Sequence, residues 1–295
     1  MAMKSKSALA LLFAVMLLAG CTLVNTDMRA KNTSPSPNAE NTHGQKPGQS
    51  RVQMHSTADK PTPDLAGGKE INVREPQPLT LAELRQKYRS TFVLNAPSSK
   101  KEVALTFDDA PDGIYTPKIL DILKREGVKA TFFVVGNRIE AHPDIMRRIV
   151  AEGHAIGNHS YNHANLPKLT DAEFRDQIRK TDELIRHYTG YVPTIVRPPY
   201  GNISEEQIKW LKSQNKIIVN WNVDSLDWKN LDAKTVEANV LAHVFPGSII
   251  LQHSGGGTGE DLTGTVEALP NIIKKLRESG LKMVTIPELL DRPIP

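Results

Sequence analysis

From about Val103 onward, short apolar runs alternate with longer segments in which apolar residues recur every three or four positions. The short runs are rich in Val, Ile, Leu and Phe, which is typical of strands buried on both faces. They predict strands at 103–107, 130–135, 154–157, 194–196, 217–221, 248–252 and 282–285. The longer segments predict helices at 117–126, 143–152, 171–188, 204–213, 233–245 and 263–279.

This alternation predicts an α/β fold in which a parallel sheet is covered by helices. About seven strand–helix units in roughly 190 residues favour a closed or nearly closed β/α barrel. An open, doubly wound sheet is the alternative architecture.

The first 20 residues have the pattern of an export signal. Lys4 and Lys6 provide a positive start, and residues 8–19 form a short apolar run. Leu-Ala-Gly-Cys at 18–21 resembles the lipobox of bacterial lipoproteins, which predicts that Cys21 is lipidated and that the protein is anchored outside the cytoplasm. An ordinary secretory signal is the alternative. Because Cys21 is the only cysteine, no intrachain disulfide can form.

Composition divides the remaining chain. Residues 21–78 contain much Pro, Gly, Ser, Thr, Gln and Lys and few large apolar residues, so they predict a disordered tether. Residues 79–99 form a lead-in segment, in which Thr80 and Glu83 predict the start of a short helix at 79–88. The folded domain is expected at 100–291. The formal net charge of +4 is too small to indicate a nucleic-acid partner.

Polar residues follow one predicted strand after another. The carboxyl ends of parallel strands meet at one face, where β/α folds build their sites. These residues are Asp108 and Asp109 after the first strand, His159 and His163 after the third, Arg197 after the fourth, Asp224 and Asp227 after the fifth, and His253 after the sixth.

The spacing of His159 and His163 lets both imidazoles converge on a helical turn or a compact loop. With one carboxylate of the Asp108–Asp109 pair they could hold a divalent metal ion. The other carboxylate and His253 remain for proton transfer, which together predicts metal-assisted hydrolysis. Non-haem iron oxygenases also use two histidines and one carboxylate, but the familiar ones have a His-x-Asp spacing on an all-β scaffold.

Three further segments carry polar or glycine-rich motifs. Prolines in Arg-Pro-Pro-Tyr-Gly at 197–201 fix a backbone that could aim Arg197 at a carboxylate; a structural proline turn is the alternative. At 224–228, Asp227 could orient a histidine and Trp228 could line a sugar pocket, although both acids also suit a turn. The Gly-rich run at 254–259 lacks the ending of a phosphate-binding loop and is interpreted as a flexible loop at the site.

Five motifs in order carry a resemblance to a known family: Thr-Phe-Asp-Asp-Ala-Pro at 106–111, His-Ser-x-x-His at 159–163, Arg-Pro-Pro-Tyr-Gly at 197–201, Asp-x-x-Asp-Trp at 224–228 and Leu-x-His at 251–253. From about residue 100 to 290 the chain resembles the NodB-homology polysaccharide deacetylases, a carbohydrate esterase family. The resemblance implies a distorted (β/α) barrel that removes acetyl groups from N-acetylated sugars.

The resemblance also implies a role for each matching residue. The implied roles are Asp109, His159 and His163 as ligands of a divalent metal ion, usually zinc; Asp108 as general base, paired with Arg197; His253 as general acid, paired with Asp227; and Tyr200, through its backbone N–H, and Leu251 as substrate-binding residues.

One departure from the family pattern is Ala110, which stands where the family usually has glycine. If the position needs a positive φ, alanine costs about 1 kcal/mol. The change leaves every candidate catalytic side chain in place.

An exported, lipid-anchored protein most readily reaches peptidoglycan, so peptidoglycan N-acetylglucosamine is the expected substrate. Chitin oligomers, an exopolysaccharide and O-acetylated xylan are alternative substrates. A wall-glycan-binding lipoprotein without activity is the alternative from a different functional class.

Overall fold

The computed structural model describes residues 61–73 and 79–292. The predicted export signal, the predicted lipidation site Cys21 and most of the predicted tether lie outside these residues. In the described part of the chain, no helix is both long and apolar enough to cross a membrane.

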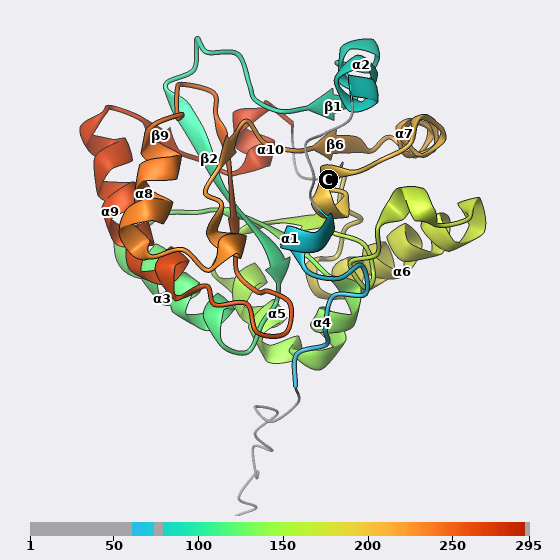
Figure 1. The fold of residues 1–295 in the computed structure, drawn as a ribbon, viewed down its shortest axis with the longest axis horizontal. Helices are drawn as coiled ribbons and strands as arrows, with labels where there is room; N and C mark the ends of the chain where they lie inside the picture. Colours follow the sequence, from blue (N-terminus) through green and yellow to red (C-terminus); the bar gives the residue numbers. More distant parts are fainter. Residues whose placement is uncertain (1–60, 74–78, 293–295) are drawn as a thin grey trace, which may run out of the picture. The chain divides into compact units, whose positions relative to one another are not determined.

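The domain is built around a sheet of nine strands in the order β1-β6-β5-β4-β3-β2-β8-β7, with β9 pairing to β2 (Figure 1). All of the ladders between these strands are parallel. Within the described residues no ladder joins β7 to β1, so the architecture is a distorted (β/α) barrel that is not closed. The strands are β1 (Phe92–Val93), β2 (Glu102–Ala110), β3 (Thr131–Val134), β4 (Ala155–Asn158), β5 (Ile195–Val196), β6 (Ile217–Val219), β7 (Val223–Asp224), β8 (Ile249–His253) and β9 (Lys282–Met283).

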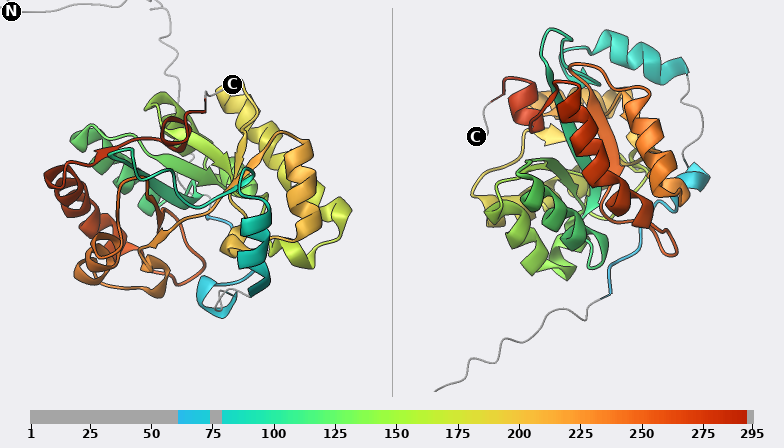
Figure 2. Two further views of the ribbon diagram at one scale, coloured as in Figure 1. Left: turned by 90° about the horizontal axis from the view of Figure 1, so that it is seen from above. Right: turned by 90° about the vertical axis from the view of Figure 1, so that its left-hand side faces the viewer.

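Helices surround the sheet on the outside of the barrel (Figure 2). The α-helices are α1 (Glu70–Val73), α2 (Leu79–Lys87), α3 (Tyr115–Glu126), α4 (Gly136–Ala141), α5 (Pro143–Ala151), α6 (Asp171–Thr189), α7 (Glu205–Ser213), α8 (Ala233–Leu241), α9 (Thr263–Glu278) and α10 (Ile286–Leu289). Three short 3₁₀ helices complete the described elements: η1 (Leu166–Lys168), η2 (Pro199–Gly201) and η3 (Asp227–Lys229).

The predicted α/β class and the element order are confirmed. Each predicted strand and helix has a counterpart, including the short helix of the lead-in segment, which is α2. The sheet has two strands more than the seven predicted, β1 and β7, which contain two residues each. Helix α4 was also not predicted, since its six residues are too few for an apolar stripe.

Strand β2 forms the centre of the core. All of its residues except Glu102 are buried, because β3 and β8 flank it and helices cover its outer face. Phe107 stacks on Phe132 of β3 with ring centroids 5.4 Å apart. Burying a large apolar side chain of this kind contributes about 1.5–3 kcal/mol to stability.

The parallel register brings the carboxyl ends of several strands together. Asp108 at the end of β2 lies opposite His253 at the end of β8. Asn158, the last residue of β4, lies opposite Val196 of β5. The residues that follow β4 and β5 therefore begin next to each other, and both groups lie near the end of β2.

The structure corrects one boundary of the predicted tether. Residues 61–73, which composition assigned to the tether, pack on the domain. Ala66 and Gly67 donate backbone hydrogen bonds to the carbonyls of Asn162 and His163, at 2.9 and 3.2 Å, and Leu65 is buried. Composition missed this contact because its hydrogen bonds are between backbone groups far apart in sequence, which leave no trace in residue type.

Candidate active site

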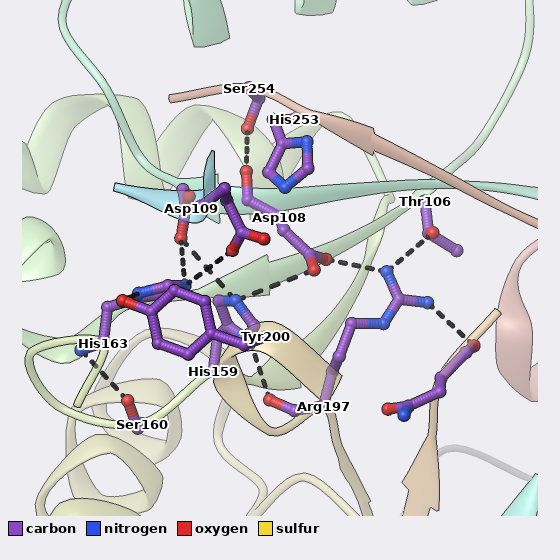
Figure 3. A network of polar contacts seen from close by, with 12 residues as sticks. Thr106, Asp108, Asp109, His159, Ser160, His163, Arg197, Tyr200, His253 and Ser254 are labelled. Atoms are coloured by element: carbon purple, nitrogen blue, oxygen red, sulfur yellow. Dashed lines mark hydrogen bonds and ion pairs between the residues drawn. The ribbon is translucent and has the colours of Figure 1, made fainter. Parts of the chain in front are cut away.

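Two adjacent carboxylates at the end of β2 point in different directions (Figure 3). Asp109 has a φ of 66°, so the chain leaves extended geometry at this residue. The side chains of Asp108 and Asp109 therefore do not follow the plain alternation of a strand. Asp108 contacts Arg197 through Oδ1, and its Oδ2 lies 3.6 Å from His159 Nε2. Asp109 faces both histidines that follow β4.

Asp109, His159 and His163 converge as a candidate metal site. Their donor atoms all lie within 4.8 Å of one another, and all three residues are buried. The Asp109 Oδ1 atom is 3.6 Å from His159 Nε2 and 3.4 Å from His163 Nε2. The three residues predicted as ligands are thus brought together by the fold.

The hydrogen bonds of both rings direct Nε2 toward the centre of this cluster. His159 donates from Nδ1 to the carbonyl of Arg197 at 2.7 Å. His163 Nδ1 lies 3.1 Å from the Tyr200 hydroxyl, which itself donates to the Gly68 carbonyl at 2.8 Å. The hydroxyl therefore accepts a hydrogen bond from the Nδ1–H group of His163, so each Nε2 carries the lone pair that a metal ligand needs.

The side chains of this cluster fit a bound cation. Among the described residues, both carboxylate oxygens of Asp109 and the Nε2 of His163 are buried without a hydrogen-bond partner. Such groups cost about 1–3 kcal/mol each when left unsatisfied. Two imidazoles and one carboxylate are also a donor set that catalytic zinc sites use.

Burial shifts the pKa values of two of these groups. It raises the pKa of the Asp109 carboxyl, although the positive charge of Arg138 opposes this. It lowers the pKa of His163 well below the usual value, and the charge of Arg138 adds to the effect. Neutral His163 is the form that binds a metal.

Arg197 holds the second carboxylate of the β2 end. Its Nη1 atom donates to Asp108 Oδ1 at 2.7 Å and to Thr106 Oγ1 at 2.8 Å, and the arginine is fully buried. The carbonyl of Val219 accepts from Nε, and the ring of Phe133 lies under the guanidinium at 4.0 Å. The predicted pairing of Arg197 with Asp108 is present in the structure.

His253 and Asp227 form a buried pair on the other side of Asp108. His253 Nδ1 lies 2.7 Å from Asp227 Oδ1. Thr265 and the backbone N–H of His253 both donate to Asp227 Oδ2. Burial lowers the pKa of His253, but the charge and hydrogen bond of Asp227 outweigh it and raise the pKa to about 10. His253 is therefore cationic at neutral pH.

The other sequence-predicted residues lie around this centre in different ways. Tyr200 is in η2 with a φ of 61°, and its side chain contacts His163. Leu251 is a buried residue of β8, and Trp228 is a largely buried residue of η3. Asp224 accepts a hydrogen bond from the Leu226 N–H at 2.9 Å. This bond is typical of a turn residue, which was one of the two interpretations of Asp224 from sequence.

Left-handed backbone conformations gather at the site. Such conformations cost about 1–3 kcal/mol each and persist where the surrounding structure holds them. Their concentration at the ends of the strands supports a functional role for this region. The non-glycine residues with positive φ here are Asp109, Ser160, His163, Tyr200 and Leu226.

Arg138 of α4 is a site residue that the sequence did not reveal. This fully buried arginine donates to the carbonyl of Asp109 at 2.9 Å and to that of Gly256 at 2.7 Å. A Cβ on Gly255 would lie 2.5 Å from Arg138 Nη1 and 2.7 Å from the Asp109 carbonyl. Glycine at 255 thus allows the loop to pack on both groups, whereas the sequence suggested only a flexible loop. No motif marked Arg138, because only the fold places it behind Asp109.

Ala110 is free of the strain considered for it. The residue belongs to β2, is fully buried and is not among the residues with positive φ in the described chain. The left-handed residue is its neighbour Asp109. Alanine therefore carries no left-handed backbone cost at position 110.

The barrel and the site together define a hydrolase that works with a metal ion. Comparison with known proteins then gives the family. The model of the polysaccharide deacetylase family matches residues 95–216. A peptidoglycan-N-acetylglucosamine deacetylase of Bacillus cereus is 51% identical over 204 residues, which cover 69% of this chain and 73% of that protein. The chain belongs to the polysaccharide deacetylase family, as its five motifs indicated.

Two further relatives agree with this assignment. The peptidoglycan-N-acetylglucosamine deacetylase PgdA of Listeria monocytogenes is 40% identical over 202 residues, covering 68% of this chain but 41% of the longer relative. The solved structure of the Bc1960 peptidoglycan N-acetylglucosamine deacetylase has a TM-score of 0.69 and 48% identity, covering 72% of this chain and 98% of that one.

Proposed function

We propose that this protein is a zinc-dependent hydrolase that removes the acetyl group from N-acetylglucosamine residues of peptidoglycan. The observation that carries the proposal is the set of unpartnered, buried atoms of Asp109 and His163, with Asp108 and His253 on the adjoining strand ends. The substrate is supported by relatives that are peptidoglycan-N-acetylglucosamine deacetylases.

Asp109, His159 and His163 would hold the metal ion. Zinc is proposed because catalytic zinc sites combine three nitrogen or oxygen ligands from the protein with one open position. When bound, the ion would polarise the acetyl carbonyl and make a water molecule easier to deprotonate.

The chain supplies the proton transfers. Asp108, oriented by Arg197 at 2.7 Å, accepts a proton from the water that attacks the acetyl carbon. His253, cationic and held by Asp227, donates its Nε2 proton to the sugar nitrogen as the carbon–nitrogen bond breaks. The products are acetate and a free amine on the sugar.

Three residues are proposed to position the substrate. The Tyr200 backbone N–H donates to the oxyanion of the tetrahedral intermediate, an interaction often worth about 3–4 kcal/mol in such enzymes. Leu251 shapes the acetyl pocket, and Trp228 of η3 provides an aromatic surface for a sugar ring.

The proposed location is the outer face of a bacterial cell membrane. Its support is the sequence of the first 21 residues, with a positive start, an apolar run and Leu-Ala-Gly-Cys. Lipidation of Cys21 would hold the enzyme beside the cell wall. One acyl chain binds a membrane only marginally, so firm anchoring needs more than one.

The first test is acetate release by the full-length protein from peptidoglycan and from N-acetylglucosamine oligomers. We expect release with Zn²⁺, loss of release after chelation, and recovery when Zn²⁺ is restored. Faster release from the oligomers than from peptidoglycan would favour the chitin alternative. No release from either glycan with zinc bound would indicate a glycan-binding protein without activity.

The Asp227–His253 pair predicts a pH effect. The pKa of His253 is about 10 in the folded protein, against 6.5 for the free side chain. The stability that its cationic form contributes is complete below pH 6.5 and is lost as the pH rises through about 10. In Asp227→Asn the charge that raises this pKa is removed while burial still lowers it, so the alkaline limb of kcat/KM moves to lower pH.

The pH profile of acetate release checks this expectation. Asp224→Asn is the matched control, because it removes a neighbouring carboxylate whose Oδ1 accepts from the Leu226 N–H. The control should leave the alkaline limb in place. If the alkaline limb of kcat/KM lies at the same pH in Asp227→Asn and in the wild type, His253 is not the general acid.

A further inference from the structure

The segment 61–73, here called the strap, ends in α1, which lies near the end of β2 (Figure 1). Its Ala66 and Gly67 N–H groups bond the carbonyls of Asn162 and His163. Its Gly68 carbonyl accepts from the Tyr200 hydroxyl. These contacts fall on two of the five motifs, so the strap is docked on the catalytic machinery itself.

The docked position is specific. A Cβ on Gly67 would lie 2.2 Å from the Tyr200 hydroxyl oxygen and 2.7 Å from the His163 carbonyl oxygen, so only glycine fits there. Asp64 accepts a bond from the Thr258 N–H at 3.0 Å on the Gly-rich loop. At the start of the strap, Thr62 lies 2.8 Å from His142 Nε2. The strap is therefore held at its start and in its middle.

The strap places an acidic side chain at the metal site. Glu70 is 3% exposed, and its Oε1 lies 3.8 Å from His163 Nε2, the nitrogen that faces the metal position. Burial lowers the pKa of His253, and the charges of Asp227 and then Glu70 raise it, so Glu70 also acts on the proposed general acid. Helix α1, which begins at Glu70, contacts η3, the element that carries Asp227 and Trp228.

We propose that the strap is an inhibitory element, whose Glu70 carboxylate takes the open side of the metal site and which the glycan must displace. Catalytic zinc sites keep one position open, whereas structural sites are closed by a fourth protein ligand. A buried carboxylate beside His163 makes the site resemble the closed kind. The part of this proposal in which the glycan displaces the strap rests on the proposed function. The docked position of the strap does not depend on that function.

The strap also precedes the domain in sequence and joins the predicted tether. The same stretch of chain thus carries the domain and covers its site. A glycan that engages the site would release the strap, and the released residues would lengthen the reach of the domain from its anchor.

The test uses the full-length, zinc-loaded protein and the substitution Glu70→Gln, with Glu83→Gln on the exposed surface of α2 as the matched control. We expect Glu70→Gln to lose zinc to a chelator at least about tenfold faster than the control. We expect its kcat/KM for an N-acetylglucosamine oligomer to rise by a similar factor. Gly67→Ala should change both quantities in the same direction, because its methyl group pushes the strap from Tyr200.

Amide hydrogen exchange provides a readout that needs no activity. The Ala66 and Gly67 amides should exchange slowly in the zinc-loaded protein and lose protection when a saturating N-acetylglucosamine hexamer is added. Increased protection on adding the hexamer, or lower kcat/KM in Glu70→Gln, would overturn the proposal and make the strap part of the substrate site. Equal zinc release from Glu70→Gln and Glu83→Gln would overturn it as well.

The strap and the enzymatic function can fail separately. If no variant releases acetate, yet Glu70→Gln loses zinc faster and the hexamer exposes the Ala66 and Gly67 amides, the strap is upheld and the deacetylase activity is not. If the wild type releases acetate, and Glu70→Gln changes neither zinc release nor amide exchange, the deacetylase activity is supported and the inhibitory role of the strap is wrong.

Discussion

Replacing Asp108 with asparagine should lower kcat for acetate release by about 10²–10⁴-fold, because a positioned general base contributes on this scale. Asparagine keeps an oxygen that can accept from Arg197 Nη1, so the buried arginine retains a partner at this position. It removes the carboxylate that takes the proton. Since Asp108 is not one of the three clustered ligands, zinc content should stay at the wild-type level.

The control for Asp108→Asn is the same substitution at a buried carboxylate outside the site. Asp182 of α6 forms another buried ion pair, with Lys216 at 2.8 Å. Asp182→Asn changes a buried carboxylate in the same way and should keep kcat near wild type, even if it lowers Tm. If a zinc-loaded Asp108→Asn protein releases acetate at a rate within about tenfold of wild type, Asp108 is not the general base. A loss of that size is smaller than the usual contribution of a general base to the rate.

Replacing His159 with alanine should abolish zinc-dependent acetate release and weaken zinc binding. His159 is preferable to His163 for this test, because His163 Nδ1 also contacts the Tyr200 hydroxyl, which bonds the strap at Gly68. Zinc present at 100 times its Kd stabilises the native protein by about 2.7 kcal/mol. The wild-type Tm should therefore fall on chelation, whereas the Tm of His159→Ala should barely respond.

Thermal unfolding with and without Zn²⁺, together with titration calorimetry, measures both effects. His187→Ala on the exposed face of α6 removes an imidazole elsewhere and should keep the zinc-dependent shift in Tm. A full zinc response in His159→Ala would show that the ion binds at another set of ligands.

Much of the fold could be predicted because its signals are local. Strand β2 shows as a continuous apolar run, since it is buried on both faces. Helix α6 shows through its amphipathic spacing, and the structure adds a capping box of Thr170 and Glu173 at its start. The two-residue strands β1 and β7 could not be found this way. Their backbone partners are β6 and β8, which lie elsewhere in the sequence.

The candidate site divides in a similar way. Asp108, Asp109, His159, His163 and His253 could be selected from sequence, because each follows a strand and parallel strands end at one face. Their relative geometry could not be read from spacing. The division of labour between the two carboxylates depends on the left-handed turn at Asp109 and on Arg197 reaching Asp108.

Composition and local order account for the alternation of strands and helices, for the family motifs and for the residue types that can bind a metal and move protons. The fold was needed to show which atoms of Asp109 and His163 lack a hydrogen-bond partner, that Arg138 supports Asp109, and that Glu70 lies beside His163. Such contacts join residues far apart in the chain, and their strength comes from burial, which no local pattern encodes.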